Sequence, residues 1–307
     1  MSPKSVKLGI LFLILFTVVI ISSKITSGPF KDLPFIGSST FHFEFKSETL
    51  SKIVQRNLGG KKGDYAIYIE YLPDPDSIGT DGENYTLRSN DTFLAASLYK
   101  LYLMVTVLSE VKNGNLKMED EINVNKSDLI QTFGDIDFGY EDAPEEISYT
   151  VEETMQRIAR ISDNFAAIAL GDKVGWDKVN QMVQDLGAKD TTIKEPISTS
   201  ASDMGAFFKK LYYREIVDQP SSDKLLDFLS LNQLNNRIPA LLPDGTKVIH
   251  KTGELPHIRH DAGIVFLPNG KAYIIVLMSQ NLEYEDDGVE ALANISKDVY
   301  EYFSSKK

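Results

Sequence analysis

Residues 94–111 read LAASLYKLYLMVTVLSEV and are the most apolar helix that the sequence predicts. A helix that is apolar on nearly all sides is buried in the core. It nevertheless contains Lys100, and a buried ammonium group is costly unless it is paired or loses its proton. Ser97 lies three residues earlier and therefore on the same helix face. This spacing is typical of a serine nucleophile with a lysine base, at a helix start whose free N–H groups can hold an oxyanion. The alternative is a capping serine and a lysine that extends to solvent.

A second polar string, Ser162-Asp163-Asn164, lies at the junction of two predicted helices. The Ser162 hydroxyl could relay a proton to a leaving amine. The Asn164 amide could bind substrate and hold Lys100 in place. Taken alone, the string could also be an ordinary helix cap.

A third string, Lys251-Thr252-Gly253, lies on a predicted strand. Thr252 can donate a hydrogen bond to a substrate carboxylate, and Gly253 permits the close approach of a ligand. Lys251 would place a second positive charge near Lys100, and two neighbouring ammonium groups lower each other's pKa. Taken alone, this string could be an ordinary strand end. The three strings together predict a serine acyl-transfer site.

The three motifs, in this order, resemble the class A serine β-lactamase enzyme family. The resemblance extends from about residue 47 to the C-terminus and includes the terminal strands and helix and the run 198–204 before a helix. It implies a three-layer α/β/α fold of the β-lactamase and transpeptidase type.

The resemblance also implies catalytic roles. Ser97 would be the acylated nucleophile, and Lys100 its general base or proton shuttle. Ser162 would relay a proton to the β-lactam nitrogen, and Asn164 would contact the substrate amide.

The remaining implied roles concern substrate binding. Lys251 and Thr252 would bind the substrate carboxylate, and Arg259 resembles the family's additional carboxylate-binding arginine. The backbone N–H groups of Ser97 and Glu254 would form the oxyanion hole.

The sequence departs from the family pattern at the step that releases the product. The family carries a Glu-x-x-Leu-Asn loop whose glutamate activates the hydrolytic water, and the candidate here is Glu195. The leucine and asparagine positions hold Ser198 and Thr199, and the loop is short. Glu195 is therefore either the deacylation base or a surface carboxylate. Glu254 replaces a small residue and would narrow or charge the oxyanion side of the site.

The implied activity is β-lactam hydrolysis through a Ser97 acyl-enzyme, with a β-lactam or a cell-wall peptide as the small-molecule substrate. The alternatives are a D-Ala-D-Ala peptidase (a penicillin-binding protein with slow deacylation) and a non-catalytic wall-binding module of the same fold. No cofactor is expected. His257, His260 and Asp261 have a spacing that resembles metal ligands, but on a strand or turn their side chains do not converge, so no metal site is expected.

The order of predicted elements indicates an α+β fold. The predicted helices are 47–58, 94–111, 150–161 with a capping box at 150–153, 163–171, 176–186, 202–216, 221–232 and 287–304. The predicted strands are 65–72, about 85–88, 247–253, 261–267 and 271–279, and residues 112–149 are expected to be irregular. This order predicts an antiparallel sheet built from both chain ends, with a mostly helical lobe inserted between them.

The composition and the N-terminal residues limit the possible partners and the cellular location of the protein. The 307 residues include 32 Lys and Arg against 44 Asp and Glu, which argues against a nucleic-acid partner. The chain has no cysteine, which excludes disulfides and thiolate chemistry. Residues 1–24 read as a signal peptide or, without an Ala-x-Ala site, as an uncleaved membrane anchor. Residues 25–46 read as a linker and residues 47–307 as the hydrolase domain, which we expect to be monomeric and to lie outside the cytoplasm.

Overall fold

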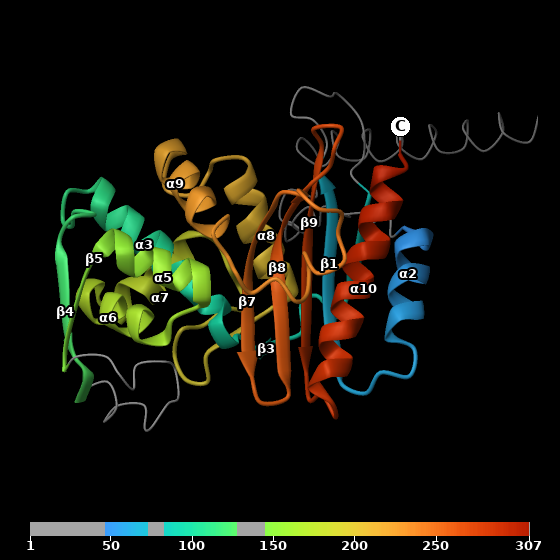
Figure 1. The fold of residues 1–307 in the computed structure, drawn as a ribbon, viewed down its shortest axis with the longest axis horizontal. Coiled ribbons are helices and arrows are strands. Elements are labelled where there is room, and N and C mark those ends of the chain that lie inside the picture. Colours follow the sequence, from blue (N-terminus) through green and yellow to red (C-terminus); the bar gives the residue numbers. More distant parts are fainter. Residues whose placement is uncertain (1–46, 73–82, 128–144, 307) are drawn as a thin grey trace, which may run out of the picture. The chain divides into compact units, whose positions relative to one another are not determined.

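Five antiparallel strands form the central sheet of the computed structural model, which describes residues 47–72, 83–127 and 145–306 (Figure 1). Their spatial order is β2-β1-β9-β8-β7. The strands are β1 (Asp64–Leu72), β2 (Asn84–Leu87), β7 (Val248–Leu255), β8 (Ile258–Phe266) and β9 (Ala272–Gln280). The β1 strand pairs with β9 along its whole length, so the two ends of the domain close one sheet, as predicted.

Two helices cover one face of this sheet (Figure 1). They are α2 (Glu48–Leu58) near the start of the domain and α10 (Glu285–Ser304) at its end, and they contact each other. Their buried side chains join those of the sheet in one apolar cluster that includes Leu50, Val54, Ile275, Leu292 and Phe303. In both helices the buried residues recur every three or four positions, as expected of a surface helix that packs one face on a core.

The opposite face is covered by α8 (Ala201–Tyr212), which contacts β1, β8 and β9. Beyond it lies the helical lobe (Figure 1). Its helices are α3 (Lys100–Lys112), α5 (Val151–Ile161), α6 (Asn164–Val174), α7 (Trp176–Asp185) and α9 (Gln219–Leu229). In α3, every residue from 100 to 108 is buried, as its all-round apolar sequence predicts. The α+β, three-layer prediction is confirmed.

The helix predicted to begin at residue 94 begins later. Phe93–Leu94 instead form a short strand, β3, that pairs with β6 (Ser198–Thr199). A 3-10 turn, η1 (Ala96–Tyr99), follows, and α3 starts at Lys100. Ala96 has a φ of 45°, a left-handed conformation that cannot continue a right-handed helix. Ser97 therefore lies on the turn before the helix.

The prediction of irregular structure throughout 112–149 is wrong at both ends of that segment. β4 (Glu121–Asn125) and β5 (Glu146–Thr150) form an antiparallel pair. Apolar and polar residues alternate in both strands, which is the period of two that a half-buried strand requires.

Element boundaries differ from the predictions by a few residues. α8 ends at Tyr212 instead of 216, and α9 covers Gln219–Leu229 instead of 221–232. The capping box at the start of α5 is confirmed: Thr150 Oγ1 accepts from Glu153 N at 3.1 Å, and the Glu153 carboxylate accepts from Thr150 N at 2.8 Å.

The predicted segments 1–24 and 25–46 lie outside the described residues, and the division of the chain into them stays a prediction. Among the described residues, no helix combines the length and the apolar character that a membrane span needs.

The strands β7 and β8 pack tightly at Gly263, and this packing can be tested by its effect on stability. A Cβ at Gly263 would collide with the Ile249 carbonyl and lie 2.6 Å from His250 Cβ, so neighbouring backbone would have to move. We expect Gly263→Ala to destabilise the fold by about 1–3 kcal/mol, the usual range for overpacking, measured as a lower Tm in thermal denaturation. Gly59→Ala is the matched control, because its added Cβ would meet its nearest neighbour at 3.4 Å. Equal melting of the two variants would contradict this packing.

Candidate active site

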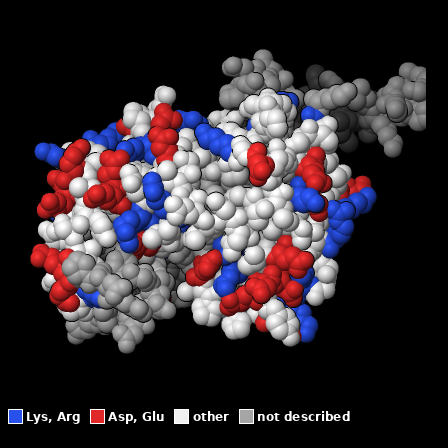
Figure 2. Space-filling view, in the orientation of Figure 1, with Lys and Arg blue, Asp and Glu red and all other residues white. Residues whose placement is uncertain are grey.

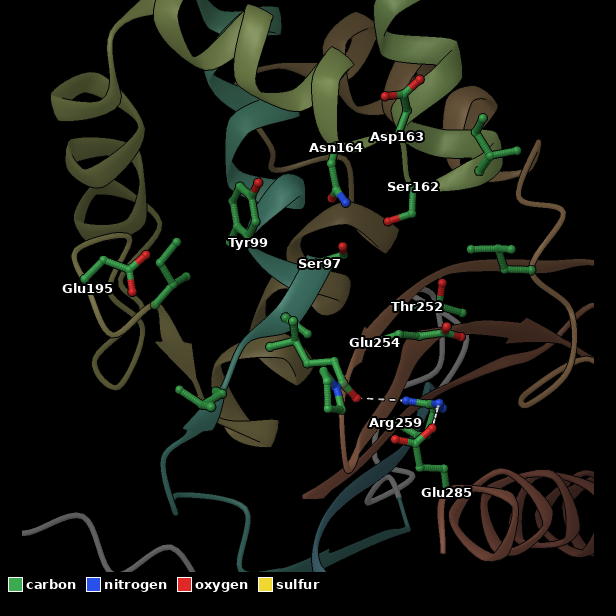
Figure 3. A pocket seen from close by; sticks show the side chains of 17 residues that line it. Ser97, Tyr99, Ser162, Asp163, Asn164, Glu195, Thr252, Glu254, Arg259 and Glu285 are labelled. Atoms are coloured by element: carbon green, nitrogen blue, oxygen red, sulfur yellow. Dashed lines mark hydrogen bonds and ion pairs between the residues drawn. The ribbon is translucent and has the colours of Figure 1, made fainter. Parts of the chain in front are cut away.

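The three motifs meet at one pocket of about 840 Å³ between the sheet and the helical lobe. Ser97 comes from η1, Ser162 and Asn164 from the α5–α6 junction, and Thr252 from β7. Figure 3 shows these side chains arranged around the same space. Lys100 and Lys251 are fully buried and connect to this space through Ser162.

Lys100 is buried and paired, so the alternative of a solvent-exposed lysine is wrong. Its Nζ donates to the Ser162 carbonyl oxygen at 2.5 Å and to Asn164 Oδ1 at 2.6 Å. Burial, and then the charge of Lys251, hold the Lys100 pKa well below its ordinary value. A neutral amine in this position can act as a base.

Lys251 reaches the same serine from the sheet. Its Nζ donates to Ser162 Oγ at 2.7 Å and to the Thr252 carbonyl oxygen at 2.8 Å. Burial lowers the Lys251 pKa to about 7, although the Asp261 carboxylate acts in the opposite direction. Ser162 thus contacts both lysines: its carbonyl oxygen accepts from Lys100, and its hydroxyl oxygen accepts from Lys251 and, at 3.4 Å, from Lys100.

The backbone of Ser162 explains how one residue serves both lysines. Its φ of 57° and ψ of 34° are left-handed, a conformation that costs a non-glycine residue about 1–2 kcal/mol. The next residue, Asp163, is fixed on two sides: it accepts from Ala166 N at 3.0 Å, which caps α6, and from Arg157 Nε at 2.7 Å. The helix junction therefore holds Ser162 in the orientation that the site uses.

The turn that carries Ser97 packs directly against β7. A Cβ at Gly253 would lie 3.2 Å from Ala96 Cβ and 3.3 Å from the Ala95 carbonyl oxygen. The sequence predicted that Gly253 makes room for a ligand, but the close neighbour is the protein's own turn. The Lys100 hydrogen bonds within the described residues go to Ser162 and Asn164, and none goes to Ser97 Oγ.

Glu195 lines the pocket and its side chain is exposed. Burial, and then the charge of Glu195, raise the pKa of Tyr99 to about 12. Ser198 and Thr199 do not line the pocket: they form β6, and Thr199 Oγ1 lies 2.8 Å from Thr191 Oγ1. Glu195 therefore lines the pocket without the leucine and asparagine that accompany the glutamate in the family pattern.

Arg259 also lines the pocket, and three of its donors are already bound. Its guanidinium pairs with the Glu285 carboxylate and donates to the carbonyl oxygens of Leu255 and Ile258. A substrate carboxylate would have to compete with Glu285 for it (Figure 3).

Sequence reasoning missed Arg237, which lies between α9 and β7. It is fully buried, and its Nη2 pairs with the carboxylate of Glu254, which lines the pocket. The segment has no periodicity that would indicate a buried arginine. The one available signal was Glu254, at a position where the family has a small residue.

The histidines of the suspected metal motif have other partners. Ser279 N donates to His260 Nδ1 at 3.1 Å, and His260 Nε2 lies 2.8 Å from the Leu94 carbonyl oxygen. Burial lowers the His260 pKa to about 4, so this histidine is neutral. His257 Nδ1 contacts the Leu282 carbonyl oxygen at 2.8 Å. No group of three candidate metal ligands occurs in the described ranges.

Comparisons with known proteins agree with this geometry. The model of the beta-lactamase enzyme family matches residues 48–303. Extended-spectrum beta-lactamase PER-1 of Pseudomonas aeruginosa is 24% identical, over 92% of this chain and 96% of PER-1.

Two solved structures share the fold. A single-residue mutant of PBP-A, in an acyl-enzyme complex with penicillin G, has a TM-score of 0.74 at 26% identity, covering 84% of this chain and 97% of that chain. TLA-3 extended-spectrum beta-lactamase has a TM-score of 0.73 at 25% identity, covering 84% of this chain and 99% of that chain. The resemblance drawn from the three motifs is confirmed. The chain belongs to the beta-lactamase enzyme family and is a serine hydrolase of that type.

Proposed function

We propose that this protein hydrolyses β-lactams through an acyl-enzyme on Ser97. The observation that carries the proposal is the meeting of two buried lysines at Ser162, at the edge of the pocket that Ser97 lines. The names of the relatives, extended-spectrum beta-lactamases among them, support this substrate class.

In the acylation step, neutral Lys100 accepts the Ser97 hydroxyl proton as Ser97 Oγ attacks the lactam carbonyl carbon. Reaching Ser97 requires the Lys100 Nζ to turn from its present acceptors, and catalytic hydrogen bonds in unliganded enzymes are often incomplete. The backbone N–H groups of Ser97 and Glu254 hold the oxyanion.

The lactam C–N bond then breaks, and its nitrogen needs a proton. Ser162 Oγ accepts a hydrogen bond from Lys251, which leaves the Ser162 hydroxyl hydrogen available for that nitrogen. The Lys100 ammonium, whose Nζ lies 3.4 Å from Ser162 Oγ, then returns the proton that it took from Ser97 to Ser162, so the lysine is neutral again. Asn164 Oδ1 is used by Lys100, which leaves the Asn164 amide NH₂ for the substrate amide.

The substrate carboxylate is assigned to Thr252, Lys251 and Arg259. Thr252 Oγ1 is buried, lines the pocket and has no hydrogen-bond partner within the described part of the chain, so an incoming acceptor would satisfy it. Lys251 supplies positive charge next to it. Arg259 can contribute only by sharing its guanidinium with Glu285.

Glu195 is proposed to activate the water that hydrolyses the acyl-enzyme. A second candidate function, a D-Ala-D-Ala peptidase with slow deacylation, is favoured by one observation: Ser198 and Thr199 are in β6 and supply no group to the pocket beside Glu195. A non-catalytic wall-binding module is disfavoured by the intact set of buried, paired lysines.

We also propose that the enzyme works outside the cytoplasm, either attached to the membrane by residues 1–24 or secreted after this segment is cleaved. The support is the apolar run 8–21 after Lys4 and Lys7.

The proposed function predicts a covalent adduct. Mixing the protein with benzylpenicillin should add one penicillin mass, located by peptide mapping at Ser97, and Ser97→Ala should form none. Time-resolved intact-mass spectrometry measures both formation and loss of the adduct. Rapid loss with turnover identifies a β-lactamase, a persistent adduct favours the peptidase, and an adduct on any other residue contradicts the mechanism.

Glu195→Gln tests the deacylation step. If Glu195 activates the water, the acyl-enzyme should accumulate and its hydrolysis should slow by about a hundredfold or more, while acylation continues. Single-turnover mass spectrometry separates the two rates. Glu215→Gln, an exposed glutamate outside the pocket, is the matched control. An unchanged deacylation rate in Glu195→Gln would remove this residue from the mechanism.

The two lysines predict a bell-shaped dependence of kcat/KM on pH for benzylpenicillin. The rate should rise with pH as Lys100 loses its proton at its lowered pKa, since only the neutral amine is a base. It should fall as pH rises through about 7, where Lys251 loses the charge that attracts the substrate carboxylate. In Lys251→Arg the guanidinium stays charged, so the fall above about 7 should disappear. An alkaline limb identical in both proteins would exclude Lys251 as its cause.

A further inference from the structure

The pair formed by Glu254 and Arg237 has no place in the proposed reaction. Arg237 is fully buried and pairs with the Glu254 carboxylate. The Glu254 side chain is 47% exposed and lines the pocket, two residues after Thr252 on β7. Side chains two apart on a strand lie on the same face, and Figure 3 shows Glu254 and Thr252 together at the pocket.

Glu254 is the carboxylate on which Arg237 depends. Arg237 Nη1 is 3.5 Å from the His260 carbonyl oxygen, at the limit of a hydrogen bond, and Nε has no partner within the described residues. A buried guanidinium left without a counter-charge is strongly unfavourable. In the free protein, Glu254 therefore neutralises Arg237 and separates it from the pocket.

The same carboxylate stands where a substrate carboxylate would arrive. Thr252 Oγ1 is a buried donor without a hydrogen-bond partner among the described residues, and an anion bound to it would lie next to Glu254. Two like charges in a partly desolvated site repel each other. Because the Glu254 side chain is half exposed, it can rotate towards solvent, and that rotation would open Arg237 to the incoming anion.

We propose that Glu254 is an internal carboxylate that competes with the substrate carboxylate for the Thr252–Arg237 side of the pocket. It is thereby a specificity-determining residue that favours substrates whose carboxylate is absent or esterified. This inference rests on the proposed function of the same pocket, and it assigns the substrate preference that the three motifs alone do not provide.

The test compares binding of benzylpenicillin and its methyl ester to the full chain carrying Ser97→Ala, so that no acylation occurs. Isothermal titration calorimetry gives a Kd for each ligand with and without Glu254→Gln. The glutamine keeps the shape of the side chain and its cover over Arg237 but removes the charge. We expect the affinity for the acid, relative to the ester, to increase about tenfold.

Glu195→Gln in the same background is the matched control. Glu195 also lines the pocket, so its neutralisation changes the overall charge of the pocket equally, and no ion pair joins it to Arg237 or Arg259 within the described residues. We define the acid-to-ester ratio as the affinity for benzylpenicillin divided by the affinity for its methyl ester. We expect this ratio to change less in the control than in Glu254→Gln. An equal change in the control, or an unchanged or decreased ratio in Glu254→Gln, overturns the proposal.

Thr252→Val keeps the test decisive if Glu254→Gln does not fold, which circular dichroism will show. Valine has the shape of threonine without its hydroxyl, so the acid-to-ester ratio should fall below that of the Ser97→Ala parent. A ratio that stays the same overturns the assignment of the anion to Thr252. Failure of the proposed function is distinguishable from these outcomes, because it is seen in the protein with Ser97 intact, as the lack of a Ser97 adduct or as an adduct that is not hydrolysed.

Discussion

Two lysine amino groups buried at one serine are the constraint on which the rest of the site depends. Each lysine alone would be costly in the core, and each is satisfied mainly by atoms of the α5–α6 junction or of its own strand. The junction must therefore be rigid, and its rigidity comes from the cap and ion pair of Asp163 and from the left-handed backbone of Ser162. Burial also weakens the hold of each lysine on its proton, which gives the site its chemical reactivity.

The fold supplies the partners of this serine from opposite sides. Lys100 begins a helix buried in the lobe, and Lys251 lies on β7 at the end of the sheet. The sheet is complete only because β1, early in the domain, pairs with β9 near its end. The pocket thus forms where a locally folded helical lobe meets a sheet that needs both ends of the domain, and neither part contains the whole site.

Residue pattern alone predicted a large part of this arrangement. The apolar residues around Lys100 implied burial, and burial implied the pairing that the structure shows. The apolar run of β9 and the capping box at Thr150 are local signals, and both led to correct elements. The turn at Ser97 was not predictable in this way, because Ala96 adopts a left-handed backbone that its residue type does not favour. Arg237 and the pairing of Arg259 with Glu285 depend on tertiary packing between distant segments, about which the spacing of residues carries no information.

His260 has a consequence for how the nucleophile is held. This imidazole contacts the carbonyl oxygen of Leu94 and accepts from Ser279, so it joins the strand just before the Ser97 turn to the middle of the sheet. With a pKa of about 4, the ring keeps the same tautomer and the same two partners from mildly acidic to alkaline conditions. The attachment of the nucleophile to its scaffold is therefore the same over that whole range, and a histidine whose spacing resembles that of a metal ligand is in effect a structural cross-link.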